Sequence, residues 1–254
     1  MILIFFVDCI NNSAPIKFAI FINFLYLNNM NNELILNKTA EDNKQIISNP
    51  QAMFDIAMQF QQLMMMYEGG IKQISTKLEI LQDDFESKHL RNPIESISSR
   101  IKEPMSIADK LQRKGLSVTI DNIVENLYDV AGIRVTCPFI SDVYKVTELL
   151  LAHDDIKLIK KKDYIKKPKQ NGYRSLHLIV EVAVYFSDQK RSIPVEIQIR
   201  TIAMDFWAAL EHQLHYKKNY TMPQNVEEEL KSIADVIASN DKRMQKLADD
   251  ILDK

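Results

Sequence analysis

A strict alternation of apolar and polar residues in one short segment is the feature that most limits how this chain can fold. The six residues from Val195 to Arg200 read VEIQIR, so that every second residue is a branched aliphatic. Successive side chains of a β-strand point to opposite faces of its sheet, so the aliphatic residues share one face and the polar residues the other. The segment predicts a strand with one buried face. Solvated surface is the simplest explanation of its polar face.

A second segment repeats this arrangement and gives the polar face a possible function. Residues 133–137 read IRVTC, which places Arg134 on the polar side of a predicted strand that Asp129 precedes. If the two strands are neighbours, they bring the carboxylates of Asp129 and Glu196 close together on one face of the sheet, beside an arginine. A carboxylate pair of this kind suits Mg²⁺, because waters and substrate phosphates commonly fill its remaining coordination positions. Catalysis of phosphoryl-type transfer would also need cations nearby, since positioning and charge neutralisation dominate it.

Cations are concentrated in one stretch of the chain, between residues 157 and 174. The formal net charge is only −2 and the pI about 6.2, so this stretch is a local electropositive patch suited to polyphosphate or RNA. A run of this kind can also be a solvated face. The patch consists of Lys157, Lys160, Lys161, Lys162, Lys166, Lys167, Lys169 and Arg174. A second group that could face the same cleft consists of Arg100, Lys102, Lys110, Arg113 and Lys114.

Residues 171–177, which read NGYRSLH, connect the basic stretch to the next predicted strand. The Asn-Gly pair favours a tight turn. Tyr173 could stack on a nucleobase, which is worth about 1–3 kcal/mol, or it could cap the sheet. His177 could contact a phosphate or be a satisfied strand histidine.

Periodicity along the rest of the chain predicts an α+β fold, a mixed β-sheet flanked by helices. From Pro50 to Phe85, apolar residues at helical spacing predict two helices, or one interrupted at Gly69-Gly70. The other expected helices are Pro104–Lys114, Asp142–Ala152, Thr201 to about Tyr216, and about Val226 to the end. The expected strands are Ile94–Ile101, Val130–Cys137, Ile156–Ile165, Leu176–Phe186 and Ile193–Ile199.

Residues 1–29 differ from the rest of the chain and form an apolar leader. Its longer apolar run is shorter than the roughly 20 residues that span a bilayer, and a basic start and a cleavage site typical of a signal peptide are missing. We expect Met30 to be the true start and residues 30–254 to form a single domain, with an anchor or signal as the alternative. Only two cysteines occur, which suits a reducing compartment. We therefore expect a cytoplasmic protein without stable membrane association.

Four motifs in this order and spacing resemble the synthetase domain of the RelA/SpoT family. They are Asp129–Val135 (DVAGIRV), Asn171–His177 (NGYRSLH), Glu196–Thr201 (EIQIRT) and Met204–His212 (MDFWAALEH). The likeness runs from about Gln51 to Lys254 and points to the small, single-domain alarmone synthetases of the family. It implies a nucleotidyltransferase-like fold and Mg²⁺-dependent transfer of a pyrophosphoryl group from ATP to the 3′-hydroxyl of GDP or GTP, which yields (p)ppGpp and AMP.

The resemblance also assigns roles on the donor side, position by position. Asp129 matches the family's Mg²⁺-binding aspartate. Glu196 matches a glutamate that assists the metal and is the candidate base for the 3′-hydroxyl. The four matching ATP-binding cations are Arg100 and Arg134, which sandwich the adenine, and Lys110 and Arg113, which hold the phosphates.

On the acceptor side, the resemblance implies four guanine nucleotide-binding residues. Tyr173 matches the aromatic residue that stacks on guanine, and Lys169 and His177 match positions that contact the acceptor. Asp205 falls where the family reads the guanine edge. An oxygen there can accept from guanine but would face another acceptor on adenine.

Two readings compete with an enzyme. The basic stretch and Tyr173 could instead form an RNA-binding regulatory module, but RNA binding would not need the paired carboxylates. A structural oligomer built from the terminal helices would leave the polar strand faces unexplained. The resemblance further implies a homo-oligomer, a tetramer in this family, with (p)ppGpp or single-stranded RNA as possible regulators. The preference between GDP and GTP stays open.

Overall fold

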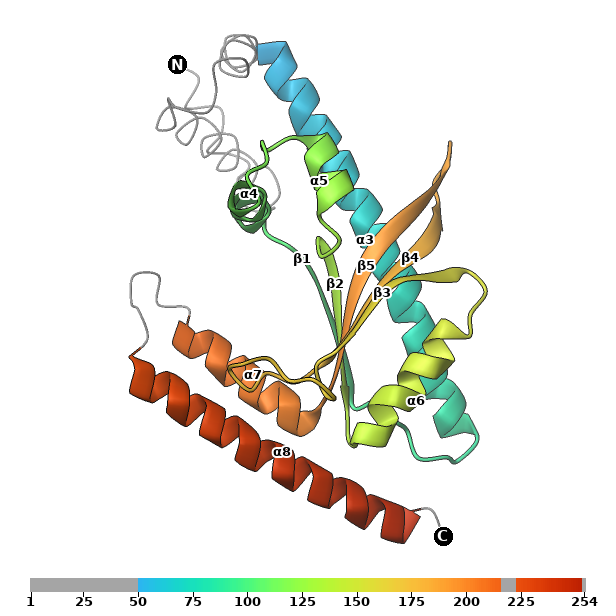
Figure 1. Ribbon diagram of the computed structural model, residues 1–254. Coiled ribbons are helices and arrows are strands. Elements are labelled where there is room, and N and C mark those ends of the chain that lie inside the picture. The colour runs from blue at the N-terminus through green and yellow to red at the C-terminus, as the bar shows by residue number, and fades with distance from the viewer. Residues whose placement is uncertain (1–49, 216–222, 253–254) are drawn as a thin grey trace, which may run out of the picture. The chain divides into compact units, whose positions relative to one another are not determined.

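The computed structural model describes residues 50–215 and 223–252 (Figure 1). The leader, the expected start at Met30 and the last residue of the helix expected to reach Tyr216 lie outside these ranges. None of the helices in the described part is long and apolar enough to cross a membrane. The chain divides into two compact units: one takes the chain up to Met65 together with Lys102–Leu127, and the other takes Met66–Ile101 together with Tyr128–Lys254.

The second unit is built on a five-stranded mixed sheet, as the strand pattern predicts. The strands are β1 (Ser96–Ile101), β2 (Ala131–Cys137), β3 (Ile156–Asp163), β4 (Leu176–Tyr185) and β5 (Lys190–Thr201). Their order in space is β1-β2-β5-β4-β3. The pair β2–β5 is parallel and the other three pairs are antiparallel. The two alternating segments of the sequence are therefore direct neighbours at the centre of the sheet.

Strand β5 begins earlier than the sequence pattern suggested. We predicted a start at Ile193, but the structure extends the strand back to Lys190, because the hairpin with β4 continues until Tyr185 faces Lys190. The three added residues are exposed, so they carry no apolar alternation that sequence reasoning could detect.

The described helices agree with the predicted pattern, with one addition. They are α3 (Pro50–Ser87), α4 (Pro104–Arg113), α5 (Ile120–Asn126), α6 (Ile140–Leu151), α7 (Ile202–His215) and α8 (Gln224–Leu252). Helix α5 was not predicted, because seven residues are too few to show a clear helical period. Its one local signal was Thr119, whose side chain caps the helix by accepting a hydrogen bond from the backbone N–H of Asn122.

Helix α3 is continuous through Gly69 and Gly70, so the predicted interruption at these glycines is wrong. They instead allow the helix to lie against β4 and β5. A Cβ on Gly70 would lie 2.7 Å from Cγ2 of Ile193, and one on Gly69 would lie 2.9 Å from Cγ1 of Val184. The glycines are thus required by close packing rather than by a turn.

The apolar face of the sheet is covered by the part of α3 in this unit and by α6, which packs across β2, β5 and β3 (Figure 1). The fully buried residues there include Ile74, Leu78, Ile133, Leu150, Leu178, Ile197 and Ile199. Helices α7 and α8 lie side by side and follow β5 directly. The opposite face of the sheet carries the polar side chains of β1, β2 and β5 that line a pocket.

The contact between α3 and β5 predicts an unusual response to a helix-favouring substitution. Gly→Ala within a helix normally stabilises by about 1 kcal/mol. We expect Gly70→Ala to lower the free energy of unfolding instead, by about 1–2 kcal/mol, because the new methyl group overpacks against the stiff side chain of Ile193. Urea denaturation measures the change. In an Ile193→Ala background, which removes the contacted Cγ2, the same substitution should cost less; a higher urea midpoint for Gly70→Ala alone would contradict this packing.

Candidate active site

A pocket on the polar face of β1, β2 and β5 brings four of the sequence-predicted residues together: Asp129, Glu196, Arg100 and Arg134. Strand pairing explains this, because Gly132 faces Arg100 on one side and Glu196 on the other. The neighbouring row of the same face contains Ser98, Arg134, Gln198 and His177. The remaining lining residues of the pocket are Ser98, Ser99, Gly132, Ile133 and Gln198.

The carboxylate of Glu196 is held in its ionised form. Burial would raise its pKa, and the charge of Asp129 acts in the same direction, but the hydrogen bond and the charge of His177, together with a hydrogen bond from Gln198, outweigh both, so that the pKa is lowered. His177 Nδ1 lies 3.3 Å from Oε1 and Gln198 Nε2 donates to Oε2 over 3.0 Å. Two carboxylates lining one pocket fit the oxygen donors that Mg²⁺ requires, with substrate phosphates to complete its coordination.

Tyr67 of α3 lies close to this pair and was not predicted as a site residue. It is 2 % exposed, and burial together with the nearby charge of Asp129 raises its pKa to about 12. A neutral phenol therefore lies beside the Asp129 carboxylate. In the sequence Tyr67 is one of the regularly spaced residues that predict the buried face of a helix. This spacing does not indicate that Asp129 lies nearby.

The predicted acceptor residues Lys169, Tyr173 and His177 form one cluster with Tyr164. The ammonium of Lys169 lies 4.6 Å from the ring centroid of Tyr173 and 5.0 Å from that of Tyr164. The hydroxyl of Tyr173 lies 2.8 Å from Nε2 of His177. Tyr164 contacts both other rings edge to face. The cluster therefore combines aromatic rings with a cation, and the hydrogen bond from His177 connects it to Glu196.

Asp205 of α7 contacts two arginines. Its Oδ1 accepts from Nη1 of Arg200 over 3.1 Å and lies 3.5 Å from Nε of Arg134. Burial and the nearby charge of Arg200 lower the pKa of Arg134, whereas Asp205 acts to raise it. The family resemblance predicts that Asp205 binds the guanine edge. In the structure it also links Arg134 of β2, a predicted adenine-binding residue, to Arg200 of β5.

Lys110 and Arg113 belong to the other unit of the chain. Both lie in the last turn of α4, where Arg113 Nε donates to the carbonyl of Asp109 over 3.3 Å. Their expected contact with ATP phosphates stays a prediction.

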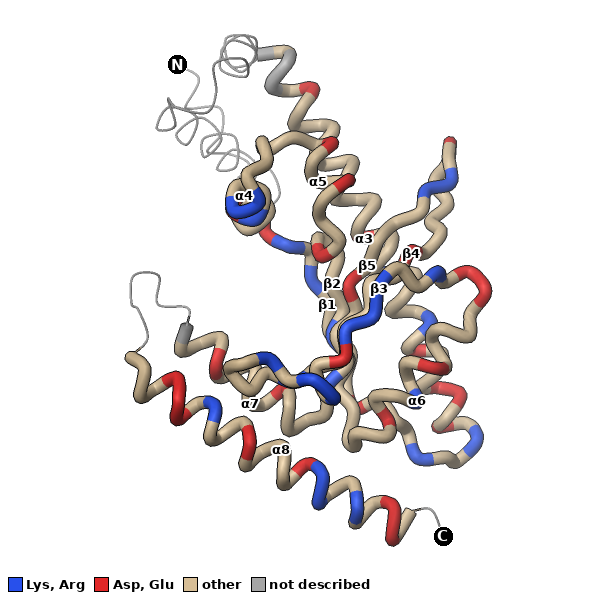
Figure 2. The backbone as a smooth tube through the Cα atoms, in the orientation of Figure 1, with Lys and Arg blue, Asp and Glu red and all other residues tan. Residues whose placement is uncertain are grey.

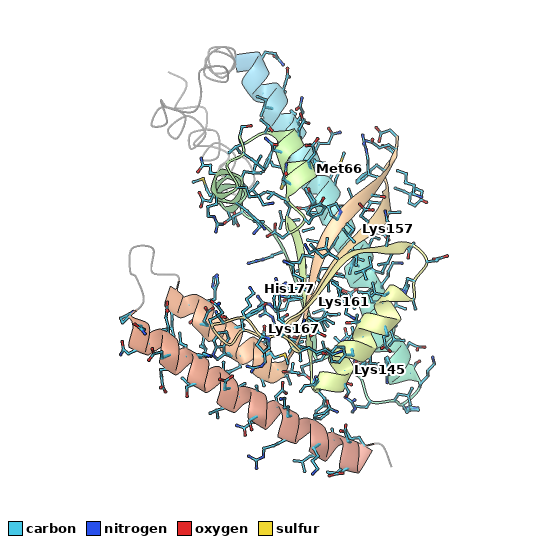
Figure 3. The ribbon with its side chains drawn as sticks, viewed as in Figure 1. Met66, Lys145, Lys157, Lys161, Lys167 and His177 are labelled. Carbon is cyan, nitrogen blue, oxygen red and sulfur yellow. The ribbon has the colours of Figure 1, made fainter. Side chains whose placement is uncertain are left out.

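The basic stretch of the sequence forms the edge strand β3 and the loop that follows it, seen as the long blue section of Figure 2. Lys162 is the cross-strand partner of His177, and Lys160 is the partner of Ile179 opposite Glu196. These two lysines therefore share the face that carries the site. Figure 3 labels His177 on β4 together with Lys161 on β3 and Lys167 in the loop.

Sequence reasoning assigned no role to Gln198, Arg200 or Tyr164. Alternation along β5 did place the first two on the same face as Glu196, and this was the available signal. Arg200 is 4 % exposed, and it donates from Nη2 to the hydroxyl of Tyr173 over 2.8 Å and to Oε1 of Gln198 over 2.6 Å. Tyr164 offered no signal, because it lies in the turn after β3, where no side-chain alternation applies.

Helix α8 holds the turn that carries Tyr173. Gly172 has a positive φ of 90°, as the Asn-Gly pair predicts, and a Cβ there would lie 2.5 Å from Cβ of Ala234. The guanidinium of Arg174 donates to the carbonyl of Ala234 and to Oδ1 of Asp235, each over 3.1 Å. Tyr173 packs against the apolar cluster of Trp207, Ala208 and Ala234. The position of the predicted stacking residue thus depends on the last helix.

A buried carboxylate fixes α8 to the end of β5. Asp241 is 6 % exposed, and its Oδ2 accepts from the hydroxyl of Thr201 over 2.7 Å. Burial raises the pKa of Asp241, and the hydrogen bond from Thr201 and the charge of Arg174 offset this only in part.

A mixed sheet flanked by helices, with paired carboxylates and arginines on its polar face beside a cluster of aromatic rings and a lysine, is the arrangement of a nucleotidyltransferase-like fold. Comparison with known proteins agrees. Residues 99–221 match the family model described as a region found in RelA/SpoT proteins. The chain is 44 % identical over 181 residues to the GTP pyrophosphokinase YwaC of Bacillus subtilis, covering 71 % of this chain and 86 % of that protein. It is 32 % identical over 193 residues to the GTP pyrophosphokinase YjbM of the same organism, covering 76 % and 90 %.

Solved structures show the same similarity. The small alarmone synthetase 1 of Bacillus subtilis bound to its product pppGpp superposes with a TM-score of 0.71 at 32 % identity, covering 76 % of this chain and 98 % of that one. The small alarmone synthetase 2 of the same organism gives a TM-score of 0.70 at 40 % identity, covering 76 % and 100 %. The chain belongs to the RelA/SpoT family, as its four motifs indicated, and within it to the small alarmone synthetases.

The raised pKa of Asp241 predicts how stability changes with pH when this residue is replaced by asparagine. A carboxyl whose pKa is higher in the folded state than in the unfolded state weakens folding when it is ionised, and this penalty disappears as the pH falls through the folded-state pKa. Asp241→Asn removes the charge but keeps an oxygen for Thr201. We expect this variant to melt at the same or a higher temperature than the wild type at about pH 7, with its advantage shrinking toward about pH 4.

Circular dichroism melts at a series of pH values measure this difference. Asp250→Asn, on an exposed position of the same helix, is the matched control and should show no such trend. An advantage for Asp241→Asn that grows as the pH falls would contradict the assignment.

Proposed function

We propose that this protein transfers the pyrophosphoryl group of ATP to the 3′-hydroxyl of GDP or GTP, yielding ppGpp or pppGpp and AMP. The observation that carries the proposal is the joint placement of Asp129 and Glu196 in one arginine-lined pocket, with Glu196 connected through His177 to Tyr173. The chain covers most of the length of two relatives named GTP pyrophosphokinase, which supports this reaction.

Arg100 and Arg134 are the proposed adenine-binding residues. Both line the pocket, from the adjacent strands β1 and β2, and planar guanidinium groups stack well on aromatic rings. Lys110 and Arg113 are proposed to hold the ATP phosphates, on the basis of the family resemblance. A structure of the small alarmone synthetase 1 of Bacillus subtilis bound to AMPCPP, which has a TM-score of 0.65 at 27 % identity, supports a donor site in this fold.

Asp129 and Glu196 are the proposed Mg²⁺ ligands. A bound Mg²⁺ would neutralise charge on the phosphate oxygens. In the transfer, the 3′-oxygen forms a bond to the β-phosphorus of ATP while the bond from that phosphorus to the α–β bridging oxygen breaks, and AMP leaves with that oxygen. Glu196, ionised by its hydrogen bonds, takes the proton of the 3′-hydroxyl.

The acceptor is proposed to bind at the aromatic cluster. Tyr173 would stack on guanine, which is worth about 1–3 kcal/mol, and Asp205 would accept hydrogen bonds from the guanine edge. Lys169, whose ammonium lies 4.6 Å from the Tyr173 ring, would meet the acceptor beside this ring, and His177 would contact it from the strand. The structure of a relative with pppGpp bound supports a guanine nucleotide site in this fold.

The protein is proposed to act in the cytoplasm as a homo-oligomer. Helices α7 and α8 carry apolar side chains that are exposed in the single chain, and burial against other copies would remove them from water. They are Ile202, Phe206, Leu210 and Leu214 on α7 and Ile233, Val236, Met244, Leu247, Ile251 and Leu252 on α8. A tetramer is the assembly that the family resemblance implies, and the lysines of β3 suit single-stranded RNA or (p)ppGpp as a regulator.

Incubation of the purified chain with Mg²⁺, ATP and either GDP or GTP tests the reaction. Anion-exchange chromatography should show equal amounts of AMP and of a guanosine nucleotide with two additional phosphates, and the faster acceptor gives the preference. If neither product forms, even with added (p)ppGpp, the RNA-binding alternative gains and RNA affinity becomes the next measurement.

Glu196→Gln should fold normally and lose activity. The amide keeps the size of the side chain but can neither take the proton nor supply a negative charge, so we expect kcat to fall by at least about 10²-fold. Glu181→Gln on β4, where the carboxylate pairs only with exposed Lys157 over 3.4 Å, is the matched control and should keep its activity. Turnover of Glu196→Gln close to that of the wild type would rule out the assigned role.

A further inference from the structure

Five side chains of the site form a closed ring of hydrogen bonds. Arg200 Nη2 donates to the hydroxyl of Tyr173 over 2.8 Å, and this hydroxyl lies 2.8 Å from Nε2 of His177. Nδ1 of His177 lies 3.3 Å from Oε1 of Glu196. On the other side, Arg200 Nη2 donates to Oε1 of Gln198 over 2.6 Å, and Gln198 Nε2 donates to Oε2 of Glu196 over 3.0 Å. Two branches thus leave Arg200 and end on the two oxygens of Glu196.

The chemistry of the groups at the two ends fixes the roles of their neighbours. A guanidinium has no acceptor, so the hydroxyl of Tyr173 accepts from Arg200. The ionised carboxylate of Glu196 has no donor, so Nδ1 of His177 donates to it, while Nε2 on the other side of the ring meets the hydroxyl of Tyr173. In the other branch, Gln198 accepts through Oε1 and donates through Nε2. Arg200 therefore holds the first side chain of each branch that ends on the carboxylate.

Arg200 is itself held firmly by the side chains around it. It is 4 % exposed and does not line the pocket, and its Nη1 donates to Asp205 over 3.1 Å. Glu196 and Gln198 precede it on the same face of β5, so the strand fixes the spacing of the three residues. Any effect of Arg200 on the reaction must pass through its neighbours.

We propose that Arg200 is a positioning residue that holds the carboxylate of Glu196 in its working orientation and couples it to Tyr173, the platform for the acceptor base. The inference rests on the proposed function and adds to it a residue on which kcat depends without contact with the reacting atoms. The same hydroxyl that links Arg200 to His177 belongs to the ring on which guanine stacks, so acceptor binding and carboxylate orientation share one hydrogen-bonded unit.

Tyr173→Phe separates stacking from the hydrogen-bond relay, because it keeps the ring and removes only the hydroxyl. We expect kcat to fall by about 3- to 10-fold while KM for the acceptor changes by less than about 2-fold, since the Gln198 branch still holds one oxygen of Glu196. A raised acceptor KM with unchanged kcat would overturn the proposal and leave the hydroxyl a role in acceptor binding alone.

Arg200→Lys keeps the charge but cannot reach Tyr173, Gln198 and Asp205 with one ammonium group. We expect kcat to fall by at least about 10-fold at saturating ATP and acceptor, with KM for ATP unchanged. Arg191→Lys, the same change at the exposed end of β5, is the matched control and should keep wild-type kinetics. Far-UV circular dichroism checks folding, and if Arg200→Lys does not fold, the kinetics of Tyr173→Phe decide alone.

A double-mutant cycle with Glu196→Gln identifies the route. If Arg200 acts through Glu196, Arg200→Lys should lower kcat by less than about 2-fold in the Glu196→Gln background. An equal loss in both backgrounds would overturn the proposal. Absence of pyrophosphoryl transfer by the wild type would instead refute the proposed function, and the inference with it, so the two failures are distinguished by the protein in which they occur.

Discussion

The parallel pairing of β2 with β5 is the contact on which the rest of the site depends. It places Gly132 opposite Glu196 and Arg134 opposite Gln198, while β1 on the other side of β2 places Arg100 opposite Gly132. Because side chains alternate along each strand, a shift of one residue in this register would place Glu196 and Arg134 on opposite faces of the sheet. The buried aliphatic residues on the apolar face, including Ile133 and Ile197, therefore also fix the geometry of the proposed active site.

Charged groups in the site are held by hydrogen bonds to neutral side chains as well as by ion pairs. Glu196 is partly buried beside another carboxylate, yet its pKa is lowered, because His177 and Gln198 each donate to it. Arg200 is almost fully buried and contacts one acid, Asp205, and two neutral oxygens. The amide of Gln198 and the hydroxyl of Tyr173 orient these charged groups without cancelling their charge, so the carboxylate stays available to cations.

Close packing by distant parts of the chain supports this arrangement from both sides of the sheet. On the apolar side, Gly69 and Gly70 let α3 approach β4 and β5, near the position where Tyr67 lies beside Asp129. On the polar side, Gly172 lets the acceptor turn approach Ala234 of α8, and Arg174 fastens it there. At each of these positions the absence of a side chain allows the backbone of one segment to pack closely against another segment. At Gly172 it also allows the positive φ of the turn.

The sequence by itself determined most of the strands and the polar and apolar faces that carry Glu196 and Arg134, since alternation is a local property of the strand backbone. Motif resemblance supplied the family and the acceptor residues, whose roles stay proposals. Helix α5, the continuity of α3, and the parts played by Tyr67, Tyr164, Gln198 and Arg200 came from the structure alone. Each of these depends on which segments pack together, and contacts between distant segments leave no period in the sequence. The ring from Arg200 to Glu196 is such a case, because it closes only when β4 pairs with β5 and places His177 beside Gln198.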